Sequence, residues 1–400
     1  SRLPGVAINR SGGEGSKVVV RGLDPKFTAI SINGVRLPST SGTDRSVDLS
    51  LISPELLSGI ELFKSPTPDM DGDAIGGSIN LNIIRAPKQA RASIKVLGGY
   101  NDLTNTYQDY KATASASQRI WDGRLGITAT ANVERFNRSG EAIRQTWGDN
   151  TSVILDEENN IALQEGNALT YEAQDEIRRR YNGSLGLDFE LGNKTDVTIL
   201  GIYSRTTRDQ FNQQESYDIN NNRITFRPEL RESAINLASG SVSTRHQLGK
   251  VRVEWGGAYS EVRGETPYQF EMDFWNTISP FDIAVYDDEN RGRPEEFHRY
   301  LQAKDDASYL QQARFINSGN NERISTGFLN LELPFQLANN VSATFKTGLK
   351  YVGTTKERIY DEAFDKNYYL RRNTYFSPLT DGAEGIGALL VDPTGDFYYS

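Results

Sequence analysis

From about residue 91 onward, apolar and polar residues alternate one by one along the chain. In the stretch 124–137, for example, every second residue is apolar: Leu125, Ile127, Ala129, Ala131 and Val133. Such alternation gives a strand one apolar and one polar face. The same pattern recurs along the chain and predicts about nine strands, near 91–101, 107–119, 124–137, 178–191, 195–208, 234–247, 251–263, 323–336 and 341–355.

The predicted strands and their connections both differ from those of soluble sheets. The strands run to about 10–15 residues, whereas strands of soluble proteins usually have about five or six. Short turns, at 121–123, 191–194, 248–250 and 337–340, alternate with long polar stretches near 138–176, 209–233, 264–321 and 356–400. This asymmetry is typical of outer-membrane barrels, with periplasmic turns and extracellular loops. A secreted β-sandwich, the alternative, would have shorter strands and no such sorting of loops.

An odd number of strands has a consequence for the barrel. Nine strands cannot close an antiparallel barrel whose two ends lie on the same side, and an unpaired edge is not viable in lipid. We therefore expect an all-β transmembrane antiparallel β-barrel of which these 400 residues supply about nine of roughly 22 strands. The chain would then be the N-terminal part of a longer barrel.

The first 88 residues carry four short motifs in a fixed order. Residues 19–22 read Val-Val-Arg-Gly, residues 30–35 Ile-Ser-Ile-Asn-Gly-Val, residues 60–66 Ile-Glu-Leu-Phe-Lys-Ser-Pro, and residues 74–80 Ala-Ile-Gly-Gly-Ser-Ile-Asn. Together they resemble the plug domain of TonB-dependent outer-membrane receptors. The resemblance implies a small mixed α/β plug domain at 1–88, with its N-terminal part missing. Residues 89–400 would be the first strands and extracellular loops of the barrel around it.

Composition removes several classes of function. The chain has no Cys, which excludes disulfides and thiolate metal sites within it, and His246 and His298 are its only histidines. The net charge of -9 is spread along the chain, and no basic face for nucleic acid is evident. No run of 18 apolar residues predicts a transmembrane helix. No catalytic constellation emerges, so we expect neither an enzyme nor a bound cofactor.

The acidic loop before the last plug motif imitates a calcium loop. Asp69, Asp71 and Asp73 have the spacing of the first ligands of an EF-hand, which also needs Gly at position six and Glu at position twelve. Ala74 and Asn80 occupy those positions, so the match fails and we expect no metal site.

The resemblance also implies a function and partners. Receptors of this family import a scarce solute across the outer membrane of Gram-negative bacteria, with energy from a TonB-type periplasmic protein. An oligosaccharide or a ferric siderophore would be the solute, and residues 36–52 slightly favour an oligosaccharide because they resemble a sub-group that includes carbohydrate importers. Outer-membrane lipid and a surface lipoprotein are further candidate partners. The alternatives are a scaffold barrel in a surface or secretion assembly, which would hold a second protein, and a signalling receptor, which would need an extra periplasmic domain.

Two groups of residues are candidates for binding the solute. The family places loops matching 36–46 and 65–73 at the binding cavity, where Arg36, Asp44, Arg45, Asp69 and Asp71 would offer hydrogen bonds. Aromatic residues of the long loops would either stack on the solute or pack the loops together; these are Trp147, Tyr268, Phe270, Phe274 and Trp275.

Two basic residues of the plug are candidates for a plug–barrel lock. Arg21 and Lys64 stand at the positions whose counterparts in the family pair with glutamates on the barrel wall, although Ser65 follows Lys64 where the family often has Gly. We expect a polar, hydrated contact between plug and barrel.

Strict alternation also predicts which side chains face lipid. Leu185, Leu187 and Phe189 would face lipid, while Ser184, Asp188 and Glu190 would face the lumen. Aromatic residues near strand ends would form interfacial girdles; these are Trp121, Phe136, Tyr181, Phe189, Tyr203, Trp255, Tyr259 and Tyr351.

Overall fold

The structure is a computed structural model of the chain. It describes residues 5–11, 14–52, 54, 57–64, 72, 74–83, 85–147, 153–156, 161–164, 166–192, 194–218, 221, 223–276, 308–338, 341–366 and 375–376. The predicted ligands Asp69 and Asp71, together with Asp73 and His298, lie outside the described residues.

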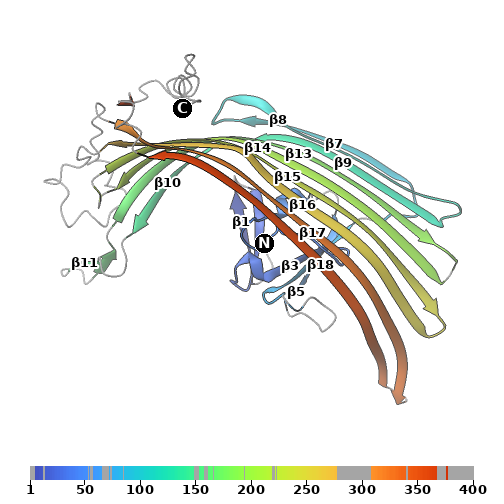
Figure 1. Cartoon of the computed structure of the whole chain (residues 1–400). Helices are drawn as coiled ribbons and strands as arrows, with labels where there is room; N and C mark the ends of the chain where they lie inside the picture. Colours follow the sequence, from blue (N-terminus) through green and yellow to red (C-terminus); the bar gives the residue numbers. More distant parts are fainter. Residues whose placement is uncertain are drawn as a thin grey trace.

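One large curved sheet forms most of the molecule (Figure 1). Nine of its strands pair antiparallel in the order β18-β17-β16-β15-β14-β13-β9-β8-β7, so the path ends at β7 and β18. Their bounds are Arg91–Asn101 (β7), Thr106–Ile120 (β8), Leu125–Asn137 (β9), Gly166–Glu190 (β13), Thr195–Asp218 (β14), Arg223–Leu248 (β15), Val251–Asn276 (β16), Ser308–Ala338 (β17) and Val341–Lys366 (β18). All nine predicted strands are confirmed.

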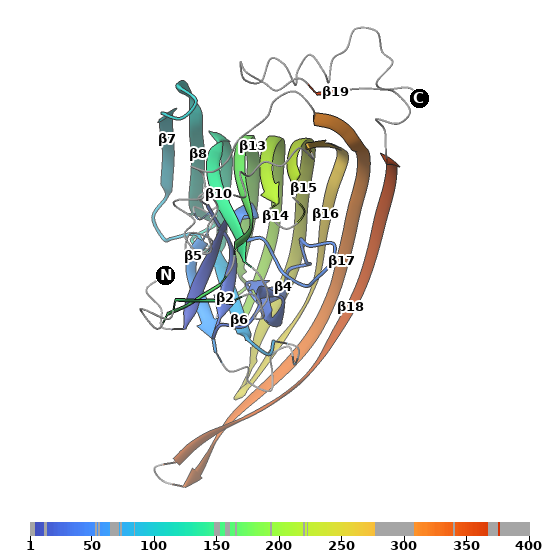
Figure 2. The ribbon, with the colours of Figure 1, turned by 90° about the vertical axis from the view of Figure 1, so that its left-hand side faces the viewer.

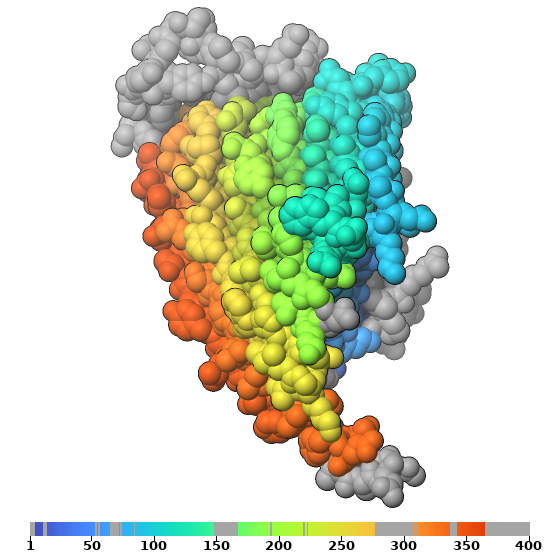
Figure 3. Space-filling view, turned by 90° about the vertical axis from the view of Figure 1, so that its right-hand side faces the viewer, coloured from blue at the N-terminus to red at the C-terminus, as the bar shows by residue number. Residues whose placement is uncertain are grey.

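Short strands accompany the large sheet at the end opposite the short turns. β10 (Gly140–Trp147) pairs with β13, and β19 (Tyr375–Phe376) pairs with β17. β11 (Val153–Asp156) and β12 (Ile161–Gln164) form a separate two-stranded hairpin. The strands of the large sheet lie side by side, as the space-filling view shows (Figure 3).

The first three short turns lie where the sequence predicts them, and the fourth, at 337–340, lies partly outside the described residues. At the first turn, Trp121, Asp122 and Gly123 all have positive φ, and the Arg124 N–H donates to the Trp121 carbonyl at 3.1 Å. Gly192 (φ 68°) and Gly249 (φ 63°) occupy the next two turns. Positive φ is the left-handed conformation that tight hairpin turns require and that glycine adopts without strain.

The long polar stretches were predicted as loops, and this prediction is wrong for much of their length. Strands β13 to β18 have 24–31 residues each, and they continue far beyond the predicted strand ends. Residues 209–218 and 223–232, for example, pair with each other in β14 and β15. The extensions carry polar side chains on both faces in many places, which removes the alternation on which the prediction depended.

The outer face of the large sheet carries the apolar side chains. Leu185 is 49% exposed, whereas the neighbouring Asn182 is buried and Asp188 pairs with Arg119 on the inner face. Most of the predicted girdle residues are exposed, namely Trp121, Tyr181, Tyr203, Trp255, Tyr259 and Tyr351. Among the described residues, no helix is long and apolar enough to cross a membrane.

A small domain lies within the concave face of the sheet (Figures 1 and 2). Its four-stranded sheet has the order β4-β3-β6-β5, with β3 (Thr28–Ile32) parallel to β6 (Gly77–Ile83) and antiparallel to β4 (Val35–Arg36); β5 (Leu57–Phe63) is antiparallel to β6. β1 (Val6–Ser11) and β2 (Glu14–Val20) form a hairpin, and two short 3-10 helices follow, η1 (Pro25–Phe27) and η2 (Leu49–Leu51). The domain boundary at residue 88 remains a prediction.

Candidate functional site

The small domain and the large sheet share one apolar core. Val20, Ile30, Ile32, Ile79 and Leu81 of the small domain, all buried, belong to it. The sheet contributes four buried side chains, which are Leu200 and Ile202 of β14, Leu237 of β15 and Val262 of β16. The contact is therefore partly dry, which differs from the wholly hydrated interface that the sequence suggested. The inner face of the sheet is apolar at these four positions, against which the small domain packs.

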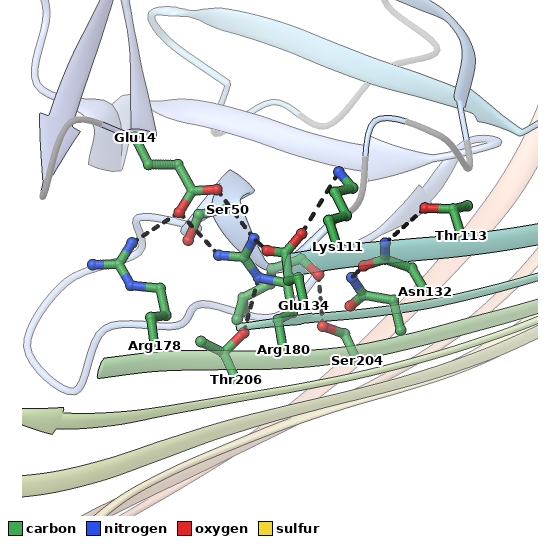
Figure 4. Close-up of polar contacts among 12 residues, drawn as sticks. Glu14, Ser50, Lys111, Thr113, Asn132, Glu134, Arg178, Arg180, Ser204 and Thr206 are labelled. Carbon is green, nitrogen blue, oxygen red and sulfur yellow. Dashed lines mark hydrogen bonds and ion pairs between the residues drawn. The ribbon is translucent and has the colours of Figure 1, made fainter. Parts of the chain in front are cut away.

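Beside this core, one carboxylate of the small domain binds two arginines of the sheet (Figure 4). Glu14, at the start of β2, accepts a hydrogen bond from Arg178 Nη1 at 2.8 Å and two from Arg180, each at 3.0 Å. Both arginine side chains are 4% exposed. Because β13 alternates its faces, Arg178 and Arg180 point inward together while Arg179 points outward to Asp209.

Carboxylates of the sheet complete this charge network. Glu176 binds Arg178 and Glu134 binds Arg180, and Lys111 lies 3.6 Å from Glu134. Buried arginines need such partners, because an unpaired buried charge is strongly unfavourable. Burial raises the pKa of Glu14, but hydrogen bonds and charges from Arg180 and Arg178 outweigh it, so the pKa lies below its ordinary value.

A second charged contact holds helix η2. Asp48 caps the helix, because its carboxylate accepts from the Ser50 N–H at 2.9 Å. Its other oxygen accepts from Arg208 Nη2 of β14 at 3.0 Å. Ser204 Oγ, also on β14, donates to the Leu51 carbonyl at 2.6 Å. Sheet and helix are thus joined at both ends of η2.

The loop 37–48, which we call the apex loop, has its own internal bonds. Ser39 Oγ donates to the Asp44 carbonyl at 2.8 Å, and Asp44 accepts from the Ser46 N–H at 2.7 Å. Burial raises the pKa of the Asp44 carboxyl, but these hydrogen bonds from Ser46 bring it below its ordinary value. The loop is therefore shaped by side-chain bonds and not by a strand ladder.

Two barrel residues hold the apex loop against the wall. Lys356 Nζ of β18 donates to the carbonyls of Ser41 and Asp44 at 3.0 and 3.2 Å. Glu322 of β17 accepts from the Ser39 N–H at 3.2 Å and pairs with Lys356 at 3.2 Å. Residues about 280 or more apart in sequence thus meet here, which alternation alone does not reveal.

The predicted lock residues lie at turns. Arg21 follows β2, has φ 57° and is exposed, and Lys64, also exposed, follows β5. The ion pairs that Glu14 and Asp48 make with the sheet have the opposite polarity, with carboxylates on the small domain and arginines on the sheet. The lock role of Arg21 and Lys64 stays a prediction. Sequence reasoning missed Glu14, Asp48, Arg178, Arg180 and Arg208, although the run at 178–180 was a visible signal.

The predicted ligands divide into two groups. Arg36, Asp44 and Arg45 lie on the small domain, and Arg36 lines a cavity of about 240 Å³ with Lys350 of β18. Trp147, Tyr268 and Trp275 lie in strands β10 and β16, and not in loops as expected. Trp275 stacks on Arg223, with 4.2 Å between the guanidinium carbon and the ring centroid. Tyr268 packs edge-on against Phe315.

Phe270 and Phe274 favour the packing alternative. Phe274 is fully buried, with Met272 and Leu310, in a second apolar cluster to which Phe270, Phe211 and Phe226 also belong. These aromatic side chains therefore join neighbouring strand extensions to each other. For Phe270 and Phe274, the structure therefore favours packing over stacking on the solute.

Comparison with known proteins identifies the small domain. A family model described as the TonB-dependent Receptor Plug Domain matches residues 1–78. The chain carries the plug domain of a TonB-dependent receptor. Such receptors are outer-membrane proteins of Gram-negative bacteria and are not enzymes, which agrees with the sequence predictions on both points.

Several solved receptor structures match the chain at low similarity. The unliganded ferric citrate transporter FecA has 14% sequence identity and a TM-score of 0.33, over 91% of this chain and 58% of that one. A variant of the ferric enterobactin receptor PfeA from Pseudomonas aeruginosa has 13% identity and a TM-score of 0.38, over 87% and 58%. The copper transporter OprC has 12% identity and a TM-score of 0.31, over 87% and 55%. The chain thus spans less than two thirds of the length of these receptors.

Proposed function

We propose that this receptor imports a small solute across the outer membrane with energy from a TonB-type periplasmic protein. The observation that carries the proposal is the plug seated in the concave face of the sheet through paired charges, Glu14 with Arg178 and Arg180, and Asp48 with Arg208. A plug in this place blocks the path along the inner face. Transport therefore requires the plug to move or to rearrange.

The contact between the plug and the sheet is non-covalent, so the two can separate without breaking a covalent bond. Ion pairs and hydrogen bonds exchange readily with water, and the shared apolar core is small on the barrel side, with four buried side chains and the partly buried Ile235 among the described residues. The outer membrane has no nucleotide supply, so a force applied from the periplasm is the remaining source of energy. The proposal includes an oligosaccharide or a ferric siderophore as solute, and a surface lipoprotein as an additional partner.

A growth screen tests the import function. A strain lacking the receptor gene is grown on a panel of iron sources and glycans, and uptake of any solute so identified is followed with and without the coupling protein. We expect loss of growth on one class of solute, and uptake that stops when the coupling protein is absent. Uptake at the same rate without the coupling protein would contradict the proposal.

The plug ligands are tested on the purified receptor. Arg45→Ala is expected to weaken binding of the solute found in that screen, because Arg45 lies exposed on the apex loop. Asp71→Ala tests the second predicted segment in the same way. Lys26→Ala, an exposed plug residue paired with Asp24 at 3.5 Å, is the control. Unchanged affinity in both test variants would exclude these loops from the site.

A further inference from the structure

The linker, residues 85–90, joins the plug to the large sheet and is held by it at one point. It runs from the end of β6, the last plug strand, to the start of β7, the first strand of the large sheet. Residues 85 and 88–90 are exposed, whereas Ala86 is only 6% exposed. The Ala86 carbonyl accepts a hydrogen bond from Arg119 Nε of β8 at 3.2 Å. The linker is therefore bonded to the sheet before β7 begins.

The guanidinium group of Arg119 is held from the sheet on its other sides. Nη1 donates to the Gly123 carbonyl, in the turn between β8 and β9, at 2.8 Å, and lies 2.9 Å from Glu190 Oε1. Nη2 pairs with Asp188 of β13. A guanidinium group is a planar fork whose N–H donors have fixed directions, so partners of Nη1 and Nη2 set the direction of Nε. The two carboxylates and the turn therefore direct Nε of this arginine at the linker.

Gly126 of β9 leaves room for this arrangement. It lies directly opposite Asp188 in the pairing of β9 with β13, and a Cβ on it would lie 2.7 Å from Asp188 Cγ. Glycine weakens the interior of a strand, and Gly126 is not among the glycines with positive φ, so its backbone conformation does not require glycine. The space that the Asp188 carboxylate occupies beside Arg119 explains the glycine.

The bond at Ala86 limits how far the plug can move from the sheet. Residues 87–90 would span roughly 13 Å if they were extended. Their far end is fixed because Arg91 begins β7, which pairs with β8. While Ala86 is bonded to Arg119, both ends of 87–90 are held by the sheet, and this length adds nothing to the reach of the plug.

We propose that Arg119, oriented by Asp188 and Glu190, is a positioning residue that anchors the linker at Ala86, so that the C-terminal end of the plug stays on the sheet when the rest of the plug moves. The anchor itself needs no solute. Its role during movement rests on the proposed import function and deepens it, because it names the end of the plug that stays in place. The ion pairs of Glu14 and Asp48 with the sheet are then the contacts that break.

Limited proteolysis of the purified full receptor tests the anchor. Trypsin cuts after Lys88 in the linker and after Lys26 elsewhere in the plug, both exposed, and mass spectrometry measures the rate of each cut. Arg119→Gln should speed the cut after Lys88 roughly tenfold, because the cut follows the population of released linker and a charge-assisted hydrogen bond is lost. The cut after Lys26 should keep its parent rate, since the plug stays folded and seated.

Three further variants make the result specific. Gly126→Ala crowds Asp188 and should speed the cut after Lys88 without any change in Arg119 or the linker. Arg119→Lys keeps the charge but has a single donor nitrogen, and should give an intermediate rate. Arg124→Gln removes an exposed arginine near the same turn and should leave the rate unchanged. Equal rates in the parent and Arg119→Gln would overturn the anchor, and so would equal acceleration of both cuts, which would mean that the whole plug has loosened.

A cross-link tests whether this end of the plug stays on the sheet during transport. Ala86→Cys and Arg119→Cys are joined in cells by a short bifunctional maleimide, and the parent chain contains no cysteine. Uptake of the solute found in the growth screen should continue at the same rate after cross-linking. A loss of uptake on cross-linking would show that the linker must leave the sheet, and would overturn the role of the anchor in transport.

The anchor and the import function fail separately. Proteolysis uses neither solute nor coupling protein, so it decides the anchor even if the cells show no coupled uptake. If coupled uptake is found and Arg119→Gln leaves the cut after Lys88 unchanged, the anchor fails and the import function stands.

Discussion

Glu14 joins the plug to the sheet at the scale of a single residue. Its carboxylate faces Arg178 and Arg180, whose side chains are each 4% exposed. On the plug side, the negative charge of Glu14 therefore compensates the positive charges of these two arginines. Glu134 and Glu176 compensate from the sheet side, and both belong to the same sheet as the arginines. Glu14 is therefore the member of the network that a plug movement would remove.

Neutralising Glu14 should weaken the seated plug. Glu14→Gln keeps the shape of the side chain but removes the negative charge that faces Arg178 and Arg180. We expect the free energy of unfolding to fall by about 3 kcal/mol, the lower end of the range for a broken buried ion pair. Chemical unfolding of the purified receptor measures it. Glu61→Gln is the matched control, because Glu61 is exposed on β5, where its carboxylate accepts a hydrogen bond from Asn80 of the same domain at 3.1 Å. Equal destabilisation by the two variants would contradict the role of Glu14.

Acid should weaken the same contact. The pKa of Glu14 in the folded receptor lies below its ordinary value of 4.5, so the ionised form favours the seated plug. This contribution is complete above pH 4.5 and is lost as the pH falls through the lower, folded value. Unfolding measured over an acid series should show a smaller pH dependence for Glu14→Gln than for the parent. The same dependence in both proteins would rule out Glu14 as its source.

The sequence identified few of these residues. The predicted lock, Arg21 and Lys64, came from motif positions, whereas Glu14 and Asp48 stand outside the four motifs. Arg178 and Arg180 share a strand face, and that much follows from alternation. Their partner, however, lies 164 residues away from Arg178, and strand periodicity carries no information about contacts between domains.

The strands have two parts with different surroundings. Toward the short turns the outer face is apolar, with Leu185, Tyr203 and Tyr259 each about half exposed. Toward the other end the strands continue with polar residues, as in 209–218 of β14. The sequence predicted the ends at the turns to within about two residues, because there the alternation stops at glycine-containing turns. The sequence did not predict the strand ends opposite the short turns. Strands that extend into water need no apolar face, so the alternation is lost there.

The stability of the barrel should depend on how deep in the membrane a charge is introduced on the outer face. Leu185 lies within the apolar band of β13, so Leu185→Arg should lower the free energy of unfolding by about 2–4 kcal/mol. Leu191 lies in the turn that follows, so Leu191→Arg should lower it by about 0–1 kcal/mol. Both leucines are exposed, at 49% and 59%, so packing within the protein does not separate them. Unfolding from lipid vesicles measures the difference. Equal costs would mean that the outer face of β13 does not contact lipid at Leu185.

The strand extensions should be ordered. Residues 211–217 of β14 pair with β13 on one side and with β15 on the other, so their amides are hydrogen-bonded. We expect slow amide hydrogen exchange there, comparable with 197–204 of the same strand. Exchange as fast as in an open loop would restore the loop interpretation of 209–233.

The whole molecule is a curved sheet with a plug on its concave face, and the proposed transport requires the plug to change place. The motifs in the first 88 residues were enough to predict the plug, and alternation was enough to predict the sheet around it. Their docking depends on side chains distant in sequence, such as Glu322 with Ser39, and only the folded chain shows it.

A reversible covalent link between plug and wall tests whether the plug must move. A Cβ on Gly42 would lie 3.8 Å from Asn320 Cβ, which is the usual Cβ separation of a disulfide, and the chain contains no other cysteine. Uptake and surface binding of the solute are measured in cells carrying Gly42→Cys and Asn320→Cys together, oxidised and then reduced, with each single variant as control.

If the plug must move, the oxidised double variant should still bind the solute, stop taking it up, and resume uptake when the disulfide is reduced. The single variants should transport under both conditions. Uptake by the oxidised double variant at the rate of the reduced one would contradict the account, because the plug would then not need to leave this part of the wall.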